Sequence, residues 1–381
     1  MVFPRILNLP HLLKQKSFFL FGPRSTGKTT LIKEQLKEKA LYVNLLEGDQ
    51  YFRFSAERYA FRELVLGQKA RCVVVDEVQK IPDLLDEVHS LIESTQIRFL
   101  LTGSSARKLK RGHANLLAGR AWTAEIFPLV SAELGRQFNL EKVIRFGSLP
   151  QVYTSSAPHE ELKAYTRTYL YEEIQAEGIV RKIPQFSRFL RCSALNYGNL
   201  INYARLASDT GVPASTLKEH YQILEDTLIG FSLQPWRHSR VRKAVSTAKF
   251  YFFDNGVTHA LSGTKQIDRN SDLFGRSFEQ WIINEVRAYL SYRRKDDELS
   301  FWRTKHGDEV DLIVGDHTAI EIKATQRATQ RDARGLERLK DEKTFKNYRL
   351  ITQDRTPGLS QGVQRLYFQD FLKRLWNDEF F

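Results

Sequence analysis

The sequence predicts an α/β protein of several domains, with a parallel sheet near the N-terminus, a mainly helical middle and a second α/β domain at the C-terminus. Short apolar runs such as Ser17–Phe21 and Cys72–Val75 are bounded by polar residues, as buried parallel strands are. Two alternating runs, Glu309–Val314 and Thr318–Lys323, flank a turn-like loop further along the chain. The length of 381 residues exceeds one ordinary core, so we expect more than one domain.

Composition and charge restrict the class of protein and of partner. Apolar residues make up 42% and charged residues 27%, which is typical of a globular chain and not of a disordered one. The two cysteines, Cys72 and Cys192, give no disulfide framework, so we expect the cytoplasm. No apolar run approaches the roughly 20 residues that cross a bilayer, so we expect no membrane partner. Lys and Arg total 58 against 45 acids, a formal charge of +13 that favours a nucleic-acid partner.

The first strand leads directly into a glycine-rich loop. Ser17–Phe21 is followed by G-x-x-x-x-G-K-T at positions 22–29 and then by a helical pattern that starts at Thr30. Strand, loop and helix in this order are the context that a phosphate-binding P-loop requires. Gly22 and Gly27 let the backbone curl so that its N–H groups face the phosphates of ATP. We count Thr30 among the cofactor-binding residues.

Four polar side chains of this region are expected to carry the nucleotide chemistry. Lys28 is expected to reach the β- and γ-phosphates, and the Thr29 hydroxyl to ligate Mg²⁺. The apolar run Cys72–Val75 is an expected strand that ends beside the P-loop, and two acids follow it. We assign Asp76 to the Mg²⁺ ion, which is the Walker B role, and Glu77 to the attacking water as general base.

Further along, polar residues follow a third expected strand. Arg98–Leu101 leads into a turn in which Ser104 first, or Thr102 second, is expected to sense the γ-phosphate. The alternative is a turn with ordinary hydroxyls. Arg120 and Arg107 are both candidates for an arginine finger toward a neighbouring subunit, which would imply a homo-oligomer. A structural role remains the alternative for each arginine.

These segments follow one another in a specific order. GPRSTGKTT, VVVDEVQ, LLTGSS, LAGRA and EIFPL are arranged as in a large prokaryotic AAA+ family, which the chain resembles over essentially its whole length. Members of that family join the ATPase to a C-terminal domain of uncharacterised function with a restriction-endonuclease-like fold. By this resemblance, Pro150 of the segment Gly147–Pro150 belongs to a lid and lies near the adenine.

The middle of the chain is similar in outline to a winged helix. A helical segment Tyr203–Ala207, a Gly-containing turn and a helix from Pro213 to about Leu228 form a helix-turn-helix pattern. Two expected strands follow, Ile229–Leu233 and Phe250–Phe253. Between them lies a basic tip of Arg237, His238, Arg240, Arg242 and Lys243. This pattern indicates DNA contact through the groove and the phosphates, or else a rigid part between domains.

The two alternating runs near the C-terminus predict a hairpin with a definite register. A three-residue loop at 315–317 pairs Val314 with Thr318, and this register places Asp311 opposite Glu321. Strict alternation then puts one set of polar side chains on a single face. These are Glu309, Asp311, Glu321 and Lys323.

Two opposed carboxylates destabilise a ladder unless a cation holds them together, and Mg²⁺ does so. The arrangement resembles the PD-(D/E)-x-K nuclease site, although Val310 stands where that motif has proline. By this resemblance Glu279, on an expected helix, is the helix carboxylate, Asp311 the central acid, and Glu321 and Lys323 the last motif. Asp311 and Glu321 would hold the metal. The alternative is a surface hairpin with a Glu309–Lys323 ion pair on a fold kept for binding.

The expected organisation is an AAA+ core at 1–130, a helical lid at 131–199, a winged helix at 200–262 and a nuclease-like domain at 270–381. We expect an ATP-dependent enzyme that acts on nucleic acid, DNA above all, with a Mg²⁺-dependent nuclease domain. The competing hypothesis is an ATP-driven switch that binds DNA or a protein partner and whose nuclease-like domain does not cut.

Overall fold

The structure is a computed structural model that describes residues 3–103, 116–169, 174, 180, 182–238 and 245–381. The chain divides into two compact units. The first consists of Met1–Leu129 with Asp226–Ile229, and the second of Val130–Glu225 with Gly230–Phe381. Among the described helices, none is long and apolar enough to cross a membrane.

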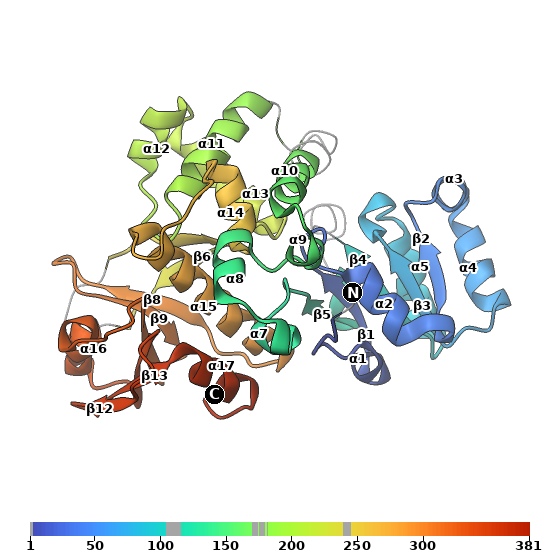
Figure 1. Cartoon of the computed structure of the whole chain (residues 1–381). Helices are drawn as coiled ribbons and strands as arrows, with labels where there is room; N and C mark the ends of the chain where they lie inside the picture. The colour runs from blue at the N-terminus through green and yellow to red at the C-terminus, as the bar shows by residue number, and fades with distance from the viewer. Residues whose placement is uncertain (1–2, 104–115, 170–173, 175–179, 181, 239–244) are drawn as a thin grey trace. The chain divides into compact units, whose positions relative to one another are not determined.

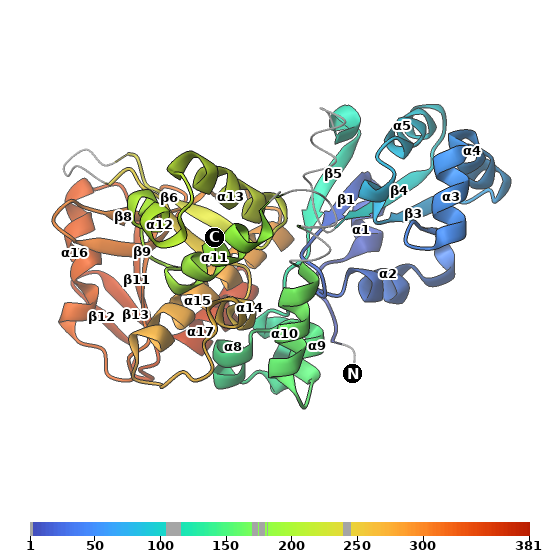
Figure 2. The ribbon, with the colours of Figure 1, turned by 90° about the horizontal axis from the view of Figure 1, so that it is seen from above.

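The first unit contains a five-stranded parallel sheet in the order β2-β3-β4-β1-β5. Its strands are β1 (Ser17–Phe21), β2 (Leu41–Asn44), β3 (Cys72–Asp76), β4 (Arg98–Gly103) and β5 (Ala121–Glu125). Its helices are α1 (Leu9–Gln15), α2 (Lys28–Leu36), α3 (Gly48–Ala56), α4 (Arg58–Gly67) and α5 (Leu84–Ser94). Figure 2 shows α2 and α5 on opposite sides of the strands. Every residue of β1 is buried, because a parallel sheet covered on both faces needs apolar strands throughout.

The sheet places β4 between the P-loop strand β1 and the strand β3 that ends in Asp76. Parallel neighbours are joined by crossover helices, so adjacency in the sequence does not decide adjacency in the sheet. The carboxyl ends of β1, β3 and β4 nevertheless meet at one edge of the sheet, which brings the loop and the acids together.

The second unit begins with a series of helices. They are α7 (Ser131–Leu134), α8 (Leu140–Phe146), α9 (Pro150–Thr154), α10 (Pro158–Thr168), α11 (Ile183–Leu195), α12 (Tyr203–Thr210), α13 (Ala214–Asp226) and α14 (Asn255–Ser262). Helix α12 ends at Gly211, whose φ of 67° is left-handed and closes the helix as a glycine C-cap does. Helix α13 ends at Asp226, so Leu228 does not continue its apolar face as expected.

The rest of the second unit is built on one eight-stranded sheet, in the order β12-β13-β11-β10-β9-β8-β6-β7. The strands are β6 (Gly230–Pro235), β7 (Lys249–Phe252), β8 (Leu299–Arg303), β9 (Glu309–Val314), β10 (Thr318–Lys323), β11 (Asn347–Thr352), β12 (Gly358–Ser360) and β13 (Val363–Tyr367). Three helices pack on it: α15 (Asp272–Tyr292), α16 (Arg334–Leu339) and α17 (Phe368–Trp376). Figure 2 shows α16 and α17 on opposite sides of these strands.

The strands expected to form a wing belong to this same sheet. Strand β6 pairs antiparallel with β7, and it also pairs in parallel with β8 through Gln234 and Pro235, so that Figure 1 shows β6 beside β8. The hairpin β6–β7 is therefore continuous with the C-terminal strands. This placement brings β7 residues to the same region as β9 and α15.

The predicted register of the β9–β10 hairpin is confirmed for the three pairs next to the loop, whereas the expected pairing of Asp311 with Glu321 is not part of this ladder. Val314 pairs with Thr318, Ile313 with Ala319 and Leu312 with Ile320. Beyond this point β10 continues in parallel with β11 as far as Lys323. The apolar side chains beneath the hairpin, including Val310, Leu336 and Leu350, form a buried cluster with Trp302. The hairpin is thus part of the core, and its polar residues are held in fixed positions.

Candidate functional sites

The P-loop requires glycine at two of its positions. Gly27 caps the N-terminus of α2 with a φ of 93°, which an L side chain rarely adopts. A Cβ on Gly22 would lie 2.4 Å from the Ile126 Cγ2 atom and 2.7 Å from the Ile126 carbonyl oxygen. Glycine at both positions allows the strand, the loop and the helix to follow one another within a few residues. The helix begins at Lys28, two residues before Thr30, and Thr30 itself is exposed.

The Lys28 side chain is buried inside the loop that it would serve. Its ammonium donates to the carbonyl oxygens of Gly22 at 2.6 Å and of Pro23 at 3.1 Å. An ammonium that donates to neutral carbonyls can exchange them for a phosphate oxygen, since a hydrogen bond between two charged groups is stronger. The position of Lys28 is therefore suited to phosphate binding.

Asp76 is the acceptor at the centre of the first site. Its Oδ2 atom lies 3.4 Å from the Thr29 hydroxyl, which brings the two expected Mg²⁺ ligands together. The hydroxyls of Tyr42 and Thr102 also donate to the Asp76 carboxylate. The Thr102 hydroxyl further accepts from the backbone N–H of Glu77 at 3.1 Å. Thr102 thus orients both acids, and its role as the second candidate for a γ-phosphate sensor stays a prediction.

Tyr42 was not identified from the sequence. It lies on β2 and reaches Asp76 because Asn44 pairs with Asp76 in the sheet. Burial raises the pKa of the Tyr42 phenol, and the Asp76 carboxylate raises it further, so Tyr42 remains a donor. Only the strand order could have indicated this contact.

Glu77 combines an unusual backbone with a perturbed carboxyl group. Its φ of 59° is left-handed, which costs a non-glycine residue about 1 kcal/mol. Burial raises the pKa of the Glu77 carboxyl; the Lys28 ammonium opposes the rise and Asp76 adds to it. The Gln79 amide donates to the carboxylate. A raised pKa brings a carboxyl group closer to the range in which it works as a general base.

The remaining nucleotide-site candidates are placed separately. Ser104 and Arg107 lie outside the described residues. Arg120 donates from Nε to the Glu93 Oε1 atom at 2.8 Å, on an exposed part of the first unit. Pro150 occupies the first turn of α9 in the second unit. The sensor, the arginine finger and the adenine contact stay predictions.

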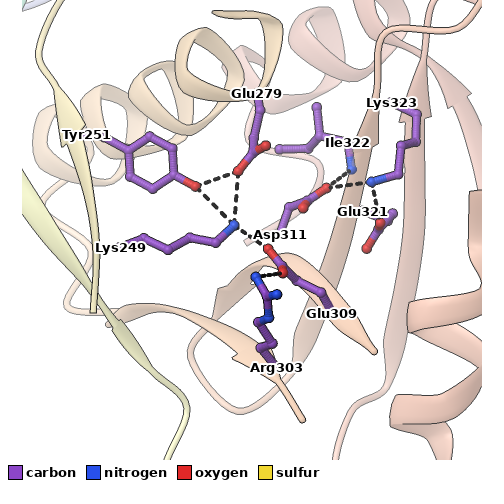
Figure 3. A network of polar contacts seen from close by, with 9 residues as sticks. All are labelled: Lys249, Tyr251, Glu279, Arg303, Glu309, Asp311, Glu321, Ile322 and Lys323. Atoms are coloured by element: carbon purple, nitrogen blue, oxygen red, sulfur yellow. Dashed lines mark hydrogen bonds and ion pairs between the residues drawn. The ribbon is translucent and has the colours of Figure 1, made fainter. Parts of the chain in front are cut away.

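The second site is an acidic cluster of four carboxylates with two lysines (Figure 3). We define the acidic cluster as Glu279, Glu309, Asp311 and Glu321, together with Lys249 and Lys323. Glu279 comes from α15 and Lys249 from β7, whereas β9 supplies Glu309 and Asp311, and β10 supplies Glu321 and Lys323. The sequence prediction therefore placed Glu279, Asp311, Glu321 and Lys323 in one site, and the structure brings these four together.

One half of the cluster surrounds Lys323. Its ammonium lies 3.3 Å from the Asp311 Oδ2 atom and 2.5 Å from the Glu321 Oε1 atom. The same Asp311 oxygen accepts the backbone N–H of Ile322 at 2.8 Å. Asp311 and Glu321 are only 4% and 5% exposed. Two acids here share a single lysine.

The Glu321 carboxylate is incompletely satisfied within the described residues. Its Oε2 atom is buried and has no hydrogen-bond partner there. Burial raises the pKa of this carboxyl well above its ordinary value; Asp311 raises it further, whereas Lys323 opposes the rise. Burying an unpartnered carboxylate oxygen costs free energy, so such an atom marks a place where a cation fits.

The other half of the cluster surrounds Lys249, which is 2% exposed. Its ammonium lies 3.3 Å from the Glu279 Oε1 atom and pairs with the Glu309 carboxylate. The Tyr251 hydroxyl donates to Glu279, and the Arg303 Nη1 atom lies 2.9 Å from the Glu309 Oε2 atom. The alternative of a surface hairpin with a Glu309–Lys323 ion pair is wrong: β9 and β10 are buried, and Glu309 pairs with Lys249 and Arg303.

Lys249 and Tyr251 were missed by the sequence interpretation. Burial alone would lower the pKa of Lys249, but Glu279, Tyr251 and Glu309 together raise it well above its ordinary value. The lysine is therefore charged. The available signal was a lysine at the start of an otherwise apolar strand, where a buried ammonium requires an acid.

A polar cleft adjoins the acidic cluster. It has a volume of about 800 Å³ and is lined by Glu279 and Lys323, with Arg269, Arg276 and Ser271 from the start of α15 and the segment before it. This volume lies in the usual range of ligand sites. Gly335 on α16 closes the other side of the hairpin, where a Cβ would lie 1.8 Å from the Glu309 carbonyl oxygen.

The donor set of the cluster suits one hard cation. In the ranges that the structure describes, no three His, Cys, Asp or Glu side chains are grouped as metal ligands. Asp311 and Glu321 are thus a pair of carboxylate ligands, and backbone carbonyls and water would complete an oxygen shell such as Mg²⁺ takes. The orphaned Glu321 oxygen is the observation that makes this pair fit the ion.

Three protein families match successive parts of the chain. Residues 14–135 match the AAA domain, residues 137–268 a domain of unknown function (DUF8612), and residues 274–371 a domain of unknown function (DUF4143). The matches leave only a few residues between them. The P-loop and the acids Asp76 and Glu77 fall in the first match, and the β9–β10 hairpin falls in the third.

Curated relatives extend over most of the chain. The uncharacterized protein Mb2031c of Mycobacterium bovis and the uncharacterized protein Rv2008c of Mycobacterium tuberculosis are each 28% identical over 317 residues, which is 80% of this chain and 70% of theirs. The uncharacterized protein MJ1544 of Methanocaldococcus jannaschii is 23% identical over 339 residues, 80% of this chain and 73% of its own.

Two solved structures of the replication initiator DnaA are distant neighbours. Domain III of the Thermotoga maritima protein has a TM-score of 0.26 and 15% identity, over 57% of this chain and 88% of that one. DnaA bound to AMPPCP and single-stranded DNA has a TM-score of 0.28 and 13% identity, over 57% and 85%. The chain contains an ATP-binding AAA domain of the P-loop ATPase class, followed by a DUF4143 domain.

Proposed function

We propose that this chain is an ATP-hydrolysing nuclease, in which the AAA domain turns over ATP and the acidic cluster cleaves phosphodiester bonds with Mg²⁺. One observation carries the second half of the proposal. Asp311 and Glu321 are buried side by side against a single lysine, and the Glu321 Oε2 atom lacks a partner within the described residues. A cation would stabilise this buried pair of acids, because one of their oxygens lacks a hydrogen-bond partner.

Asp311, Glu321 and Lys323 have defined tasks in this proposal. Asp311 and Glu321 hold the ion, which when bound activates a water and neutralises charge on the phosphate. Lys323 is 37% exposed and lines the cleft, so its ammonium can donate to a phosphate oxygen or to the attacking water. The backbone N–H of Ile322 fixes the Asp311 carboxylate by its 2.8 Å hydrogen bond.

The substrate class follows from charge. The chain carries a formal charge of +13, and the cleft places Arg269 and Arg276 beside the acids. The cleft lining is mixed in charge, since Asp272, Glu279 and Asp332 lie in it beside the basic side chains, and the basic side chains are the groups that would contact the backbone of a polyanion. Of the basic tip, Arg237 and His238 are described and exposed, whereas Arg240, Arg242 and Lys243 lie outside the described residues. We propose DNA as the substrate, with the helices α12 and α13 as a second contact.

The roles in the AAA domain follow from the contacts of its P-loop. Lys28 moves from the loop carbonyls to the phosphates, and Thr29 with Asp76 holds the Mg²⁺ ion of the nucleotide. Glu77, with its raised pKa, is the base for the attacking water. Thr102 keeps both acids oriented through its hydroxyl.

The proposal is tested by a cleavage assay on single-stranded, duplex and branched DNA, with Mg²⁺ or Mn²⁺ and with or without ATP. We expect cleavage of at least one form, its loss on chelation with EDTA, and a much slower reaction in Lys323→Ala that still requires the metal. The absence of cleavage of every form with either ion would contradict the nuclease assignment.

A second candidate function is supported by the lysines. Each carboxylate of the cluster contacts a cationic side chain of the chain itself, so the acids are partly neutralised without a metal. In that reading the chain is an ATP-driven switch that binds DNA or a protein, and the cluster only stabilises the fold. The two candidates diverge on metal binding: the switch takes up no divalent ion at Asp311 and Glu321.

A further inference from the structure

We propose that Lys249 is a fixed counter-ion that closes one half of the acidic cluster and thereby limits the cluster to a single divalent ion, at Asp311 and Glu321. Lys249 is then a positioning residue, which acts on the reaction through Glu279 and Glu309. This inference rests on the proposed function, because it assumes that Asp311 and Glu321 bind an ion. It goes further in stating that the acidic cluster binds one ion and that Lys249 is the residue that limits the number to one.

Lys249 occupies the place that a second ion would need. Figure 3 shows its ammonium between the carboxylates of Glu279 and Glu309, one from α15 and one from β9. The Tyr251 hydroxyl lies 3.4 Å from the ammonium, and the Phe301 ring centroid lies 5.3 Å from it. Two carboxylates, a phenol and an aromatic face therefore surround this one charge on separate sides.

The two lysines of the cluster differ in freedom. The Lys249 side chain is 2% exposed, and its backbone is held by pairing with Leu233 on β6 and by a bridge to Leu200. The Lys323 side chain is 37% exposed and faces the cleft. Lys323 can move aside when an ion binds its two acids, whereas the buried Lys249 ammonium is held between Glu279 and Glu309. The half around Lys249 is thus closed to ions.

The balance of charge points to the same half. Glu279 and Glu309 are matched by Lys249 and Arg303, so two negative charges meet two positive ones. Asp311 and Glu321 both form their ion pair with Lys323, and Asp311 also interacts at longer range with Lys249. Two carboxylates that share one lysine are less fully compensated than two that share a lysine and an arginine, so a divalent ion is drawn to Asp311 and Glu321. The orphaned Glu321 oxygen lies in this same half.

Removing Lys249 should open the second position. In Lys249→Met the carboxylates of Glu279 and Glu309 keep their positions on α15 and β9 but lose the ammonium between them. Two carboxylates and the Tyr251 hydroxyl are oxygen ligands of the kind that Mg²⁺ and Mn²⁺ prefer. We therefore expect the variant to bind a second ion where the wild-type lysine excludes it.

The test counts bound Mn²⁺ by titration calorimetry and electron paramagnetic resonance on the nucleotide-free full chain. All proteins carry Asp76→Asn, which removes an ion ligand of the P-loop so that only the acidic cluster is counted. We expect one ion in this parent, none after adding Asp311→Asn, and two after adding Lys249→Met. Adding Glu309→Gln to Lys249→Met removes a carboxylate of the new position and should return the count to one.

The outcomes separate this inference from the function on which it rests. No ion in the parent overturns the proposed function itself. Two ions in the parent, or one ion in a folded Lys249→Met protein, overturn the role of Lys249 and leave the nuclease proposal intact. If Lys249→Met does not fold, as judged by circular dichroism, Lys249→Gln serves instead, since it keeps polar atoms in the buried position and should also bind two ions. Two ions in the parent would overturn the role of Lys249 whatever the outcome with either variant.

Discussion

Thr102 is a single hydroxyl on which both acids of the nucleotide site depend. It donates to Asp76 and accepts from the backbone N–H of Glu77, and it is fully buried. Replacing it by valine keeps the shape and leaves a buried acceptor and a buried donor without their partner, at a cost of about 1–3 kcal/mol. The two acids would then be free to rotate away from the nucleotide.

The resulting prediction concerns the rate of ATP hydrolysis. Thr102→Val should lower kcat by about 10-fold or more, because each 1.4 kcal/mol lost from the transition state is tenfold in rate. Nucleotide affinity should change little, since Lys28 and the loop backbone are untouched. Steady-state ATPase assays and fluorescent-nucleotide titration measure the two quantities. Thr95→Val at the end of α5 is the matched control. An unchanged kcat in Thr102→Val would show that the Thr102 hydroxyl does not contribute to ATP hydrolysis.

Glu285 is a second residue whose surroundings set its charge. Burial raises its pKa to about 7, although Trp376 and Ser131 donate hydrogen bonds to its carboxylate. A group with a raised pKa in the folded state stabilises the fold below its unfolded pKa, and this contribution is lost as the pH rises through the folded value. Between pH 5.5 and 8 the loss amounts to about 2 kcal/mol.

We therefore expect the free energy of unfolding of the second unit to fall from pH 5.5 to pH 8, and to fall by less in Glu285→Gln. Urea unfolding followed by tryptophan fluorescence reports mainly this unit, because Trp236, Trp281, Trp302 and Trp376 all lie in it. Asp254 also has a raised pKa, of about 6, but it is common to both proteins and cancels in the comparison. If the free energy of unfolding depended on pH equally in the wild type and in Glu285→Gln, the raised pKa assigned to Glu285 would be contradicted.

At the scale of elements, the segment Gly147–Pro150 connects α8 and α9 around a buried carboxylate. The Asp254 Oδ2 atom accepts the backbone N–H of Ser148 at 2.7 Å, and Oδ1 accepts that of Val257 at 3.1 Å. A Cβ on Gly147 would lie 1.9 Å from the Asp254 Oδ1 atom, and the Gly147 φ of 71° is left-handed. The glycine is required by this contact between helix termini.

Gly147→Ala should accordingly destabilise the second unit by about 3 kcal/mol or more, because it displaces a buried carboxylate from its donors. Gly263→Ala is the control: its φ is also left-handed, at 80°, but no atom lies within 4 Å of the added Cβ. Strain alone should cost about 1 kcal/mol there. Urea unfolding measures both. Equal losses in the two variants would show that only backbone strain matters at Gly147.

The elements also show what the sequence could and could not predict. The register of β9 and β10 was predictable, because a three-residue loop and strict alternation leave one pairing that buries Val310, Leu312 and Ile320. The contact of Lys249 with Glu279 and Glu309 was not, because it depends on pairing between strands far apart in the chain. The same applies to Tyr42 and Asp76, and to β4 between β1 and β3. Local pattern fixes faces and loops, whereas strand order is set by long-range packing.

At the scale of the whole molecule, the eight-stranded sheet makes the second unit one folding body. Strands β6 and β7 extend the C-terminal strands, and β7 supplies Lys249 and Tyr251 to the cluster. A fragment that begins at Asp272 lacks both strands. It exposes the edge of β8 and removes Lys249 from Glu279 and from the partly exposed Glu309, which is destabilising.

We expect the fragment 272–381 to be unfolded or to melt without a cooperative transition, whereas the fragment 130–381 should unfold cooperatively. Circular dichroism during thermal unfolding distinguishes the two results. A cooperative transition in the shorter fragment would show that the C-terminal strands form a domain without the β6–β7 hairpin, and that Lys249 is dispensable for its stability.

The most direct measurement of the central claim compares two rates in one preparation of the full chain: ATP hydrolysis and Mn²⁺-dependent cleavage of DNA. Asp311→Asn removes one charge from the proposed ion site, and Asp296→Asn makes the same change at an exposed position before β8. The account predicts that Asp311→Asn lowers cleavage by about 100-fold or more, the equivalent of about 2.7 kcal/mol, and leaves ATP hydrolysis unchanged, while Asp296→Asn alters neither. Cleavage by Asp311→Asn at the wild-type rate would contradict the claim that the acidic cluster is a catalytic centre.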